Sequence, residues 1–163
     1  MNKVTSVLGA KIVAKAWADP SYKALLLADG AAGMAELGIP GTGQSAELIV
    51  VENTASQHNL VVCTLCSCYS SALLGWPPDW FKSRSYRARA VREPRAVLSE
   101  FGLTLGDDVA VAVHDSTADM RYLVLPERPG GTEGYTEEQL AGLVTRDSMV
   151  GVCRASVPGG AAL

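Results

Sequence analysis

The sequence is most informative at Val61-Val62-Cys63-Thr64-Leu65-Cys66-Ser67-Cys68-Tyr69, where an apolar run of strand type ends in three cysteines. The thiols have the spacing C-x-x-C-x-C, so they can converge only if the backbone turns back sharply where the strand ends. We therefore expect a cysteine hook, the name used below for residues 63–68, at the end of a strand.

A structural zinc site is one interpretation of the hook. Such a site needs four ligands in a tetrahedron, which usually come from two spaced pairs. The hook supplies one pair, and the candidates for a fourth ligand, none at pair spacing, are Cys153, His58 and His114. Simple apolar packing of the thiols and a redox pair are further alternatives.

The segment Cys66-Ser67-Cys68 offers a different set of ligands. Two thiolates flank two backbone amides, and together they can close fused chelate rings on one ion. An amide nitrogen binds a metal only after losing its proton, which requires a strong Lewis acid such as a trivalent transition ion. This segment therefore favours Co(III) or Fe(III) over Zn(II).

Around the hook, apolar periodicity and turn residues predict an α+β fold. The expected elements are two or three short helices within 9–37, strands at 47–52 and 59–63, two helices within 83–101, strands at 109–114 and 122–125, and a last helix from 136 to 146. We expect an N-terminal helical segment at 1–43, a metal-binding catalytic domain at 44–155 and a flexible tail at 156–163. Trp17, Trp76, Trp80 and Tyr86 are expected to be core or subunit-interface aromatics, with the core favoured.

Composition sets the broad class of protein. The chain has 163 residues, of which 48% are hydrophobic and 19% charged, as in an ordinary single globular domain. Its net charge of −3 offers no basic field for nucleic acid. The longest apolar runs, such as 24–28 and 60–63, fall far short of the roughly 18 residues of a membrane span, and no signal-peptide pattern is present at the start. We expect no membrane partner and a cytoplasmic location.

The run VVCTLCSCY resembles the metal-binding signature of the nitrile hydratase α subunit, C-[ST]-L-C-S-C. The resemblance extends over nearly the whole chain, in the blocks GAKIVAKAWADP at 9–20, VVENT at 50–54, PPDWFK at 77–82, YRARAVREPR at 86–95, MRYLVLP at 120–126 and LVTRDSM at 143–149. It implies the fold of that subunit, in which N-terminal helices precede a layered α-β-β-α domain with the metal at a strand end. Little sequence precedes Gly9, so a variant with a short N-terminal arm is expected.

The resemblance also implies the chemistry of the site. Its metal ligands are the sulfurs of Cys63, Cys66 and Cys68 and the amide nitrogens of Ser67 and Cys68, and Thr64 at the second motif position goes with cobalt rather than iron. Carried over by position, Cys66 is oxidised to sulfinate and Cys68 to sulfenate, whereas Cys63 stays a thiolate. The implied reaction is hydration of a nitrile to an amide, with Cys68, Cys66 and Ser67 as the catalytic residues.

Three further residues are candidates for the substrate pocket. Gln44 falls where the family has a polar glutamine near the site, and an ordinary loop residue is the alternative. Ser70 and Ser71 stand where many members carry proline and a bulky residue, which would enlarge the cavity beside the metal unless neighbouring side chains refill the space.

Charge indicates a partner. Three sulfur anions and two amidates around a trivalent ion leave about −2 by formal count, which needs cations nearby. No Lys or Arg occurs between Ala24 and Phe81, so the cations come from the basic stretch at 82–95, which could also be an ordinary solvated face, or from a second polypeptide. The resemblance implies a β-type subunit that supplies arginines, and a metal-loading activator protein.

Two rival functions remain open on the sequence. One is the γ subunit of thiocyanate hydrolase, which has the same cysteine hook. The other, of a different class, is a non-enzymatic module that holds zinc or carries cobalt.

Overall fold

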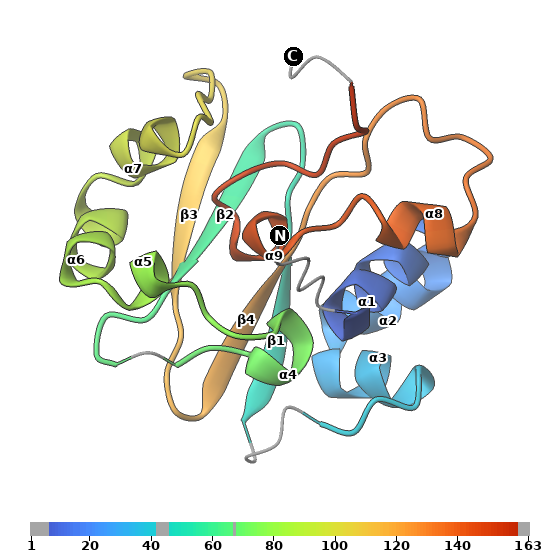
Figure 1. Cartoon of the computed structure of the whole chain (residues 1–163). Coiled ribbons are helices and arrows are strands. Elements are labelled where there is room, and N and C mark those ends of the chain that lie inside the picture. Colours follow the sequence, from blue (N-terminus) through green and yellow to red (C-terminus); the bar gives the residue numbers. More distant parts are fainter. Residues whose placement is uncertain (1–6, 42–45, 67, 160–163) are drawn as a thin grey trace.

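Two pairs of parallel strands lie at the centre of the fold in this computed structural model, which describes residues 7–41, 46–66 and 68–159 (Figure 1). The strands, in chain order, are β1 (Glu47–Glu52), β2 (Gln57–Val62), β3 (Ala110–Asp115) and β4 (Met120–Leu125). Strand β1 pairs with β4, and β2 pairs with β3. Parallel neighbours cannot be joined by a tight hairpin, so long crossovers connect the partners of each pair.

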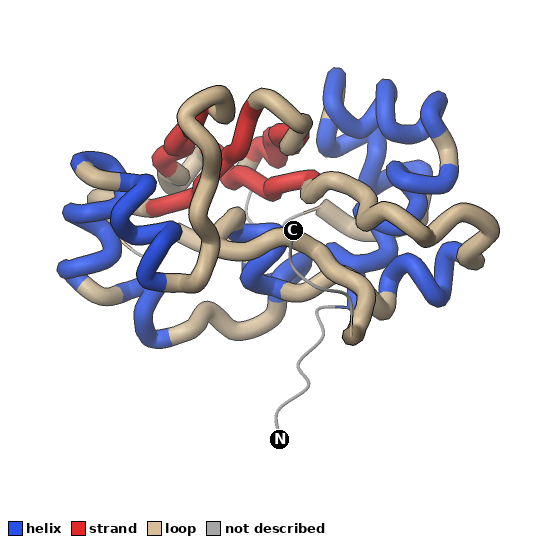
Figure 2. The backbone as a smooth tube through the Cα atoms, turned by 90° about the horizontal axis from the view of Figure 1, so that it is seen from above, coloured by secondary structure: helices blue, strands red, loops and turns tan. Residues whose placement is uncertain are grey.

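Helices flank the strands on two sides, as the view from above shows (Figure 2). On the side of β1 and β4 lie α1 (Val7–Ala18), α2 (Pro20–Ala28) and α3 (Gly30–Glu36). On the side of β2 and β3 lie α6 (Arg84–Arg92) and α7 (Pro94–Glu100), with α5 (Asp79–Lys82) leading into them. Short helices complete the described chain: α4 (Ser71–Leu74) and α8 (Glu137–Ala141) against α1, and α9 (Arg146–Val150) against β4 and β2. The expected α+β fold is confirmed.

The breaks between the first helices come from two aspartates. Asp19 is the N-cap of α2, where its carboxylate accepts hydrogen bonds from the backbone N–H groups of Ser21 and Tyr22, and Pro20 occupies the first helical position. Asp29 ends α2 and caps α3 by accepting from the N–H of Ala32. The prediction of two or three short helices in this region is therefore confirmed.

Strand β2 is the most buried of the strands described. Every residue after Gln57 is buried, and Leu60 and Val62 are fully enclosed by the core. The core around them combines residues of all the layers, including Ile12, Val13, Leu26, Leu98, Leu123, Leu125 and Met149. A strand buried on both faces reads as a continuous apolar run, which is why the sequence before the hook lacks alternation. The hook thus begins at the edge of a rigid core.

One expectation about the C-terminal half is wrong. The predicted single helix from 136 to 146 ends early: α8 stops at Ala141, the backbone turns, and a second helix, α9, begins only at Arg146, because Thr136 and Thr145 each form their own capping box. Of the aromatics expected in the core or at a subunit interface, Tyr86 is buried, whereas Trp76 is 81% exposed and lies outside this chain's core, which leaves the subunit interface as the expectation for it.

A buried polar network joins the two strand pairs. The His58 Nε2–H donates to the carbonyl oxygen of Gly151 at 2.6 Å, so the other ring nitrogen accepts from the Asn53 side-chain amide at 3.3 Å. Asn53 Oδ1 in turn accepts from the backbone N–H of Asn59, whose own Oδ1 lies 2.8 Å from His114 Nε2. This arrangement holds His58 neutral, and it occupies both histidines that a zinc site could have used.

Stability should fall in mild acid because of this network. Burial lowers the pKa of His58 below its usual 6.5, with Arg154 also lowering it and the Gly151 carbonyl and Glu127 opposing. Since the unfolded chain protonates first, the stabilising contribution is complete above about pH 6.5 and decreases below it, by at most about 1.4 kcal/mol per pH unit for one proton. We expect His58→Gln to flatten the dependence of the unfolding free energy on pH between 7 and 5. An unchanged slope in chemical denaturation at these pH values would contradict this role.

Candidate metal centre

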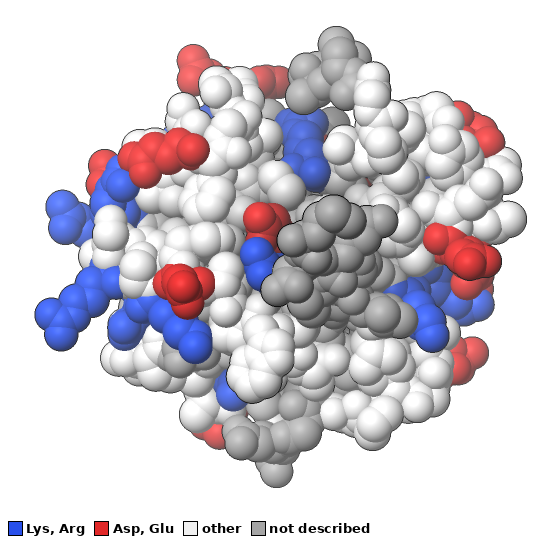
Figure 3. All heavy atoms as spheres, in the orientation of Figure 1, with Lys and Arg blue, Asp and Glu red and all other residues white. Residues whose placement is uncertain are grey.

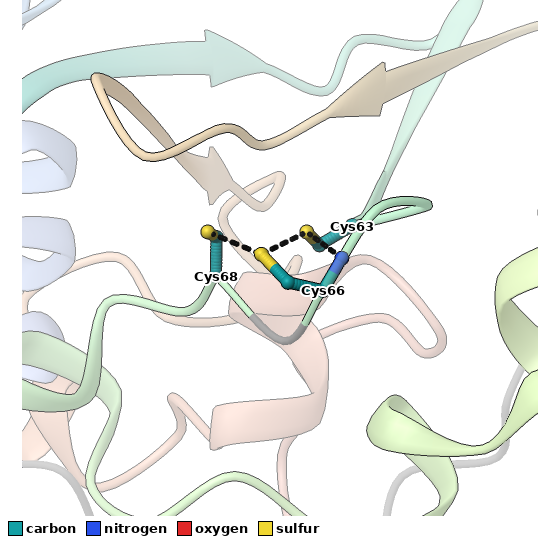
Figure 4. Close-up of side chains that lie close together, drawn as sticks. All are labelled: Cys63, Cys66 and Cys68. Carbon is teal, nitrogen blue, oxygen red and sulfur yellow. Dashed lines mark hydrogen bonds between the residues drawn. The ribbon is translucent and has the colours of Figure 1, made fainter.

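The three hook cysteines converge, as Figure 4 shows. Cys63 is the first residue after β2, and its Sγ lies 3.3 Å from the Sγ of Cys66, which lies 2.7 Å from the Sγ of Cys68. All three sulfurs lie within 4.8 Å of one another. The backbone N–H of Cys66 points at Cys63 Sγ, with 3.4 Å between nitrogen and sulfur, so the chain turns back on itself here. The sharp turn expected after the strand is therefore present.

The hook is held from below by the end of β3. The parallel register places Asp115 beside Val62, one residue before the hook begins. From there the Asp115 carboxylate accepts two hydrogen bonds from Thr64, one from its backbone N–H at 2.8 Å and one from its hydroxyl at 2.6 Å. A carboxylate that accepts two bonds from one residue fixes both its backbone and its side chain.

Helix α6 holds the hook from the side. Arg87 donates to the carbonyl oxygens of Cys63 and Thr64, at 3.0 and 2.7 Å. The Tyr86 hydroxyl donates to the Val61 carbonyl at 2.6 Å, just before the hook. One member of the basic stretch therefore does reach the hook, through main-chain oxygens rather than sulfurs.

The environments of the three thiols differ. Cys63 is fully buried, Cys68 is partly buried and Cys66 is exposed. Burial, and next the hydrogen bond with Cys66, raises the pKa of the Cys68 thiol to about 12. A metal ion deprotonates the thiols that bind it, so a bound ion would offset this raised pKa of Cys68.

The donor set fits a metal ion of the expected kind. Among the residues described, no other His, Cys, Asp or Glu joins the three sulfurs, so the four side-chain ligands of a structural zinc site are not assembled there. Cys153 lies elsewhere, with its Sγ 3.8 Å from the Thr145 hydroxyl. The main-chain nitrogens that the C-S-C segment predicts as further donors stay a prediction.

The other predicted site residues lie in different places. Ser67 and Gln44 fall outside the described residues. Ser70 is buried, and its hydroxyl and that of Tyr69 have no hydrogen-bond partner among the residues described. Both line an enclosed space beside Cys68 that is too tight for a water molecule. Ser71 lies on the exposed surface at the start of α4, and the wider cavity expected beside the metal stays a prediction.

Comparison with known proteins identifies the family. The protein-family model described as nitrile hydratase, alpha chain, matches residues 1–153 of this chain. The chain is 56% identical over 157 residues to the alpha subunit of the low-molecular-weight cobalt-containing nitrile hydratase of Rhodococcus rhodochrous, covering 96% of this chain and 75% of that subunit. The chain belongs to the nitrile hydratase alpha-chain family. The expectation of an enzyme subunit of the nitrile hydratase type is confirmed with it.

Two further relatives show that proteins related to the nitrile hydratase alpha-chain family are named for different metals and substrates. A solved chain of a double-mutant Fe-type nitrile hydratase from Comamonas testosteroni Ni1 superposes with a TM-score of 0.90 at 47% identity, covering 97% of this chain and 77% of that one. The gamma subunit of thiocyanate hydrolase from Thiobacillus thioparus is 46% identical over 153 residues, covering 88% of this chain and 63% of that subunit. The fold is thus shared by proteins named for cobalt, for iron and for a different substrate.

A search of the described helices for a membrane span finds none with the length and apolar character that a bilayer requires.

Asp115 was not predicted as a site residue of this nitrile hydratase alpha chain, and it offers a direct test of the hook's support. Asp115→Ala removes both acceptors for Thr64, which are worth about 1–3 kcal/mol together. We expect buried Cys63 to react at least about fivefold faster with iodoacetamide in the reduced, metal-free chain. The control is Asp119→Ala, which removes an exposed carboxylate outside the hook. An equal rate of Cys63 alkylation in both variants would show that Asp115 does not hold the hook.

Proposed function

We propose that this chain is the catalytic α subunit of a nitrile hydratase, which converts a nitrile and one water molecule into the corresponding amide. The supporting observation is the convergence of the sulfurs of Cys63, Cys66 and Cys68 within 4.8 Å in a chain of this family. The proposed metal is Co(III), in keeping with Thr64 and with the cobalt-containing relative, and Fe(III) is the alternative.

The proposed ligands are the three sulfurs and the amide nitrogens of Ser67 and Cys68. The bound metal would supply Lewis acidity, which polarises a nitrile toward attack at its carbon. Cys66 is proposed to be a sulfinate and Cys68 a sulfenate, with Cys63 a thiolate. The differing environments support this order, since Cys63 is enclosed by protein whereas Cys66 is exposed.

Within the proposal, the chain's own residues have separate roles. The Cys68 sulfenate oxygen either takes the proton from a water that attacks the nitrile carbon, or attacks that carbon itself. In the second case a water molecule then adds to the carbon and the bond to the sulfenate oxygen breaks, which restores the sulfenate. In both routes the oxygen of water stays on the carbon and its two protons end on the nitrogen, giving the amide. Asp115 and Arg87 keep Thr64 and the Cys63 carbonyl in place, which fixes the sulfurs relative to one another. Gln44, Ser70 and Ser71 are retained as proposed pocket residues.

A β-type subunit is the proposed partner. The cobalt-containing relative is itself named as a subunit, and Arg87 is the member of the basic stretch whose hydrogen bonds end on the hook's carbonyls, so arginines for the sulfur oxygens are proposed to come from the second chain. A metal-loading activator protein and a cytoplasmic location are proposed with it.

The test is an assay of the chain co-expressed with a β-type subunit in cobalt-supplemented medium. Hydration of small nitriles such as acrylonitrile, with about one cobalt per chain and no comparable hydrolysis of thiocyanate, supports the proposal. Faster turnover of thiocyanate would favour the role suggested by the gamma-subunit relative. Stoichiometric zinc with fully reduced cysteines and no turnover would favour a non-enzymatic metal module.

A further inference from the structure

A groove with a basic wall runs along helix α6 next to the hook. It has a volume of about 510 Å³ and is lined by Thr64, Arg84, Arg87, Ala88, Val91 and Arg92. Arg84, Ala88 and Arg92 are spaced four residues apart, so they follow one another along one face of the helix. This face turns away from β2, because buried Tyr86 and Ala90 occupy the opposite side.

The charges of the groove are not balanced within the part of the chain described. Arg84 and Arg92 are exposed and form no hydrogen bond or ion pair there, whereas Arg87 is bound to the hook carbonyls. The neighbouring Arg89 is neutralised by Glu93 and Glu100, at 2.7 and 2.5 Å. Basic side chains gather over α5 and α6 at the left of Figure 3, although the whole chain carries a net charge of −3.

The groove also has an apolar part. Val91 is 50% exposed, and Leu65, which follows groove residue Thr64 in the chain, is 83% exposed. Arginine is enriched in the surfaces that protein partners cover, and these exposed apolar side chains add area that a partner could bury. No aromatic side chain lines the groove, so the stacking surface by which single-stranded nucleic acid is bound is missing among these residues.

We propose that this groove docks an acidic segment of the second subunit, with carboxylates against Arg84 and Arg92 and an apolar side chain over Val91. Because Thr64 forms one wall, the docked segment lies against the hook and positions the second subunit over its exposed cysteine, Cys66. The inference rests on the proposed function in that the partner is the β-type subunit. It assigns to α6 a recognition role that is separate from Arg87's support of the hook.

Charge reversal in the co-expressed complex tests whether the groove docks the second subunit. Arg84→Glu combined with Arg92→Glu is compared with Lys11→Glu combined with Arg154→Glu, which reverses two exposed cations outside the groove. Association of the two subunits is measured by analytical ultracentrifugation at 50 and 500 mM NaCl. We expect the groove variant to bind at least about tenfold more weakly at low salt and less than about threefold more weakly at high salt, with the control variant within about twofold of wild type.

The outcomes separate the two proposals. Equal weakening by the groove and control variants, or none by either, overturns the docking site, as does a groove variant that assembles normally but loses binding to an oligonucleotide. Arg84→Gln combined with Arg92→Gln should give an intermediate loss, and its far-UV circular dichroism shows that α6 remains folded. A wild-type complex that assembles but hydrates no nitrile overturns the proposed function alone, since the association measurements still decide the docking site.

Discussion

Cys68→Ser is expected to lower nitrile hydration by the co-assembled protein by at least about a thousandfold, which corresponds to about 4 kcal/mol of lost transition-state stabilisation. A serine oxygen is a harder ligand than sulfur, and it cannot be oxidised to a sulfenate. The substitution would also remove the sulfur that lies 2.7 Å from the Sγ of Cys66. Activity is measured with acrylonitrile, and bound cobalt is measured by elemental analysis.

Cys153→Ser is the matched control for that experiment. Cys153 is partly buried and its sulfur contacts Thr145, outside the hook. Its removal should leave both activity and cobalt content within about a factor of two of wild type, as expected for a cysteine with no part in the reaction. A Cys68→Ser protein that kept more than about a tenth of wild-type activity would contradict the assignment of Cys68.

Gly151→Ala is expected to destabilise the chain by about 3 kcal/mol or more. Gly151 ends α9 with φ at +97°, and a Cβ placed there would lie 2.1 Å from the carbonyl oxygen of Asn59 in β2. Neither backbone can move away easily, because the Gly151 carbonyl also accepts the hydrogen bond from His58. The measurement is the free energy of unfolding by urea.

The control for Gly151 is Gly102→Ala. Gly102 has φ at +88°, but a Cβ there would meet no atom within 4 Å, so only the left-handed backbone is penalised, by about 1–2 kcal/mol. The difference between the two variants isolates the contact of α9 with β2. Equal losses in both would mean that α9 does not pack against the strand as closely as described.

The sequence predicts the hook well because its signal is local. The apolar run before Cys63 is long enough for a buried strand, and the cysteine spacing then requires a turn. Both features depend only on residues within about ten positions of each other, and the same holds for the short helices capped by Asp19 and Asp29.

The support of the hook could not be predicted in the same way. Asp115 is adjacent to Val62 only because β2 and β3 pair in parallel, and this register is decided by side-chain packing between segments about fifty residues apart. Arg87 stood in a basic stretch whose members look alike in sequence, yet it is bound to hook carbonyls whereas Arg84 is exposed. The core was the favoured expectation for Trp76 because large aromatics are usually buried, and its exposure leaves the other expectation, a subunit interface.

The most direct test of the account is mass spectrometry of the active complex after tryptic digestion. Residues 24–82 form one peptide without internal Lys or Arg, so a single fragment contains Cys63, Cys66 and Cys68. We expect a gain of three oxygen atoms, two on Cys66 and one on Cys68, in protein that contains cobalt and hydrates nitriles. Fully active protein in which all three hook cysteines are unoxidised thiols would contradict it.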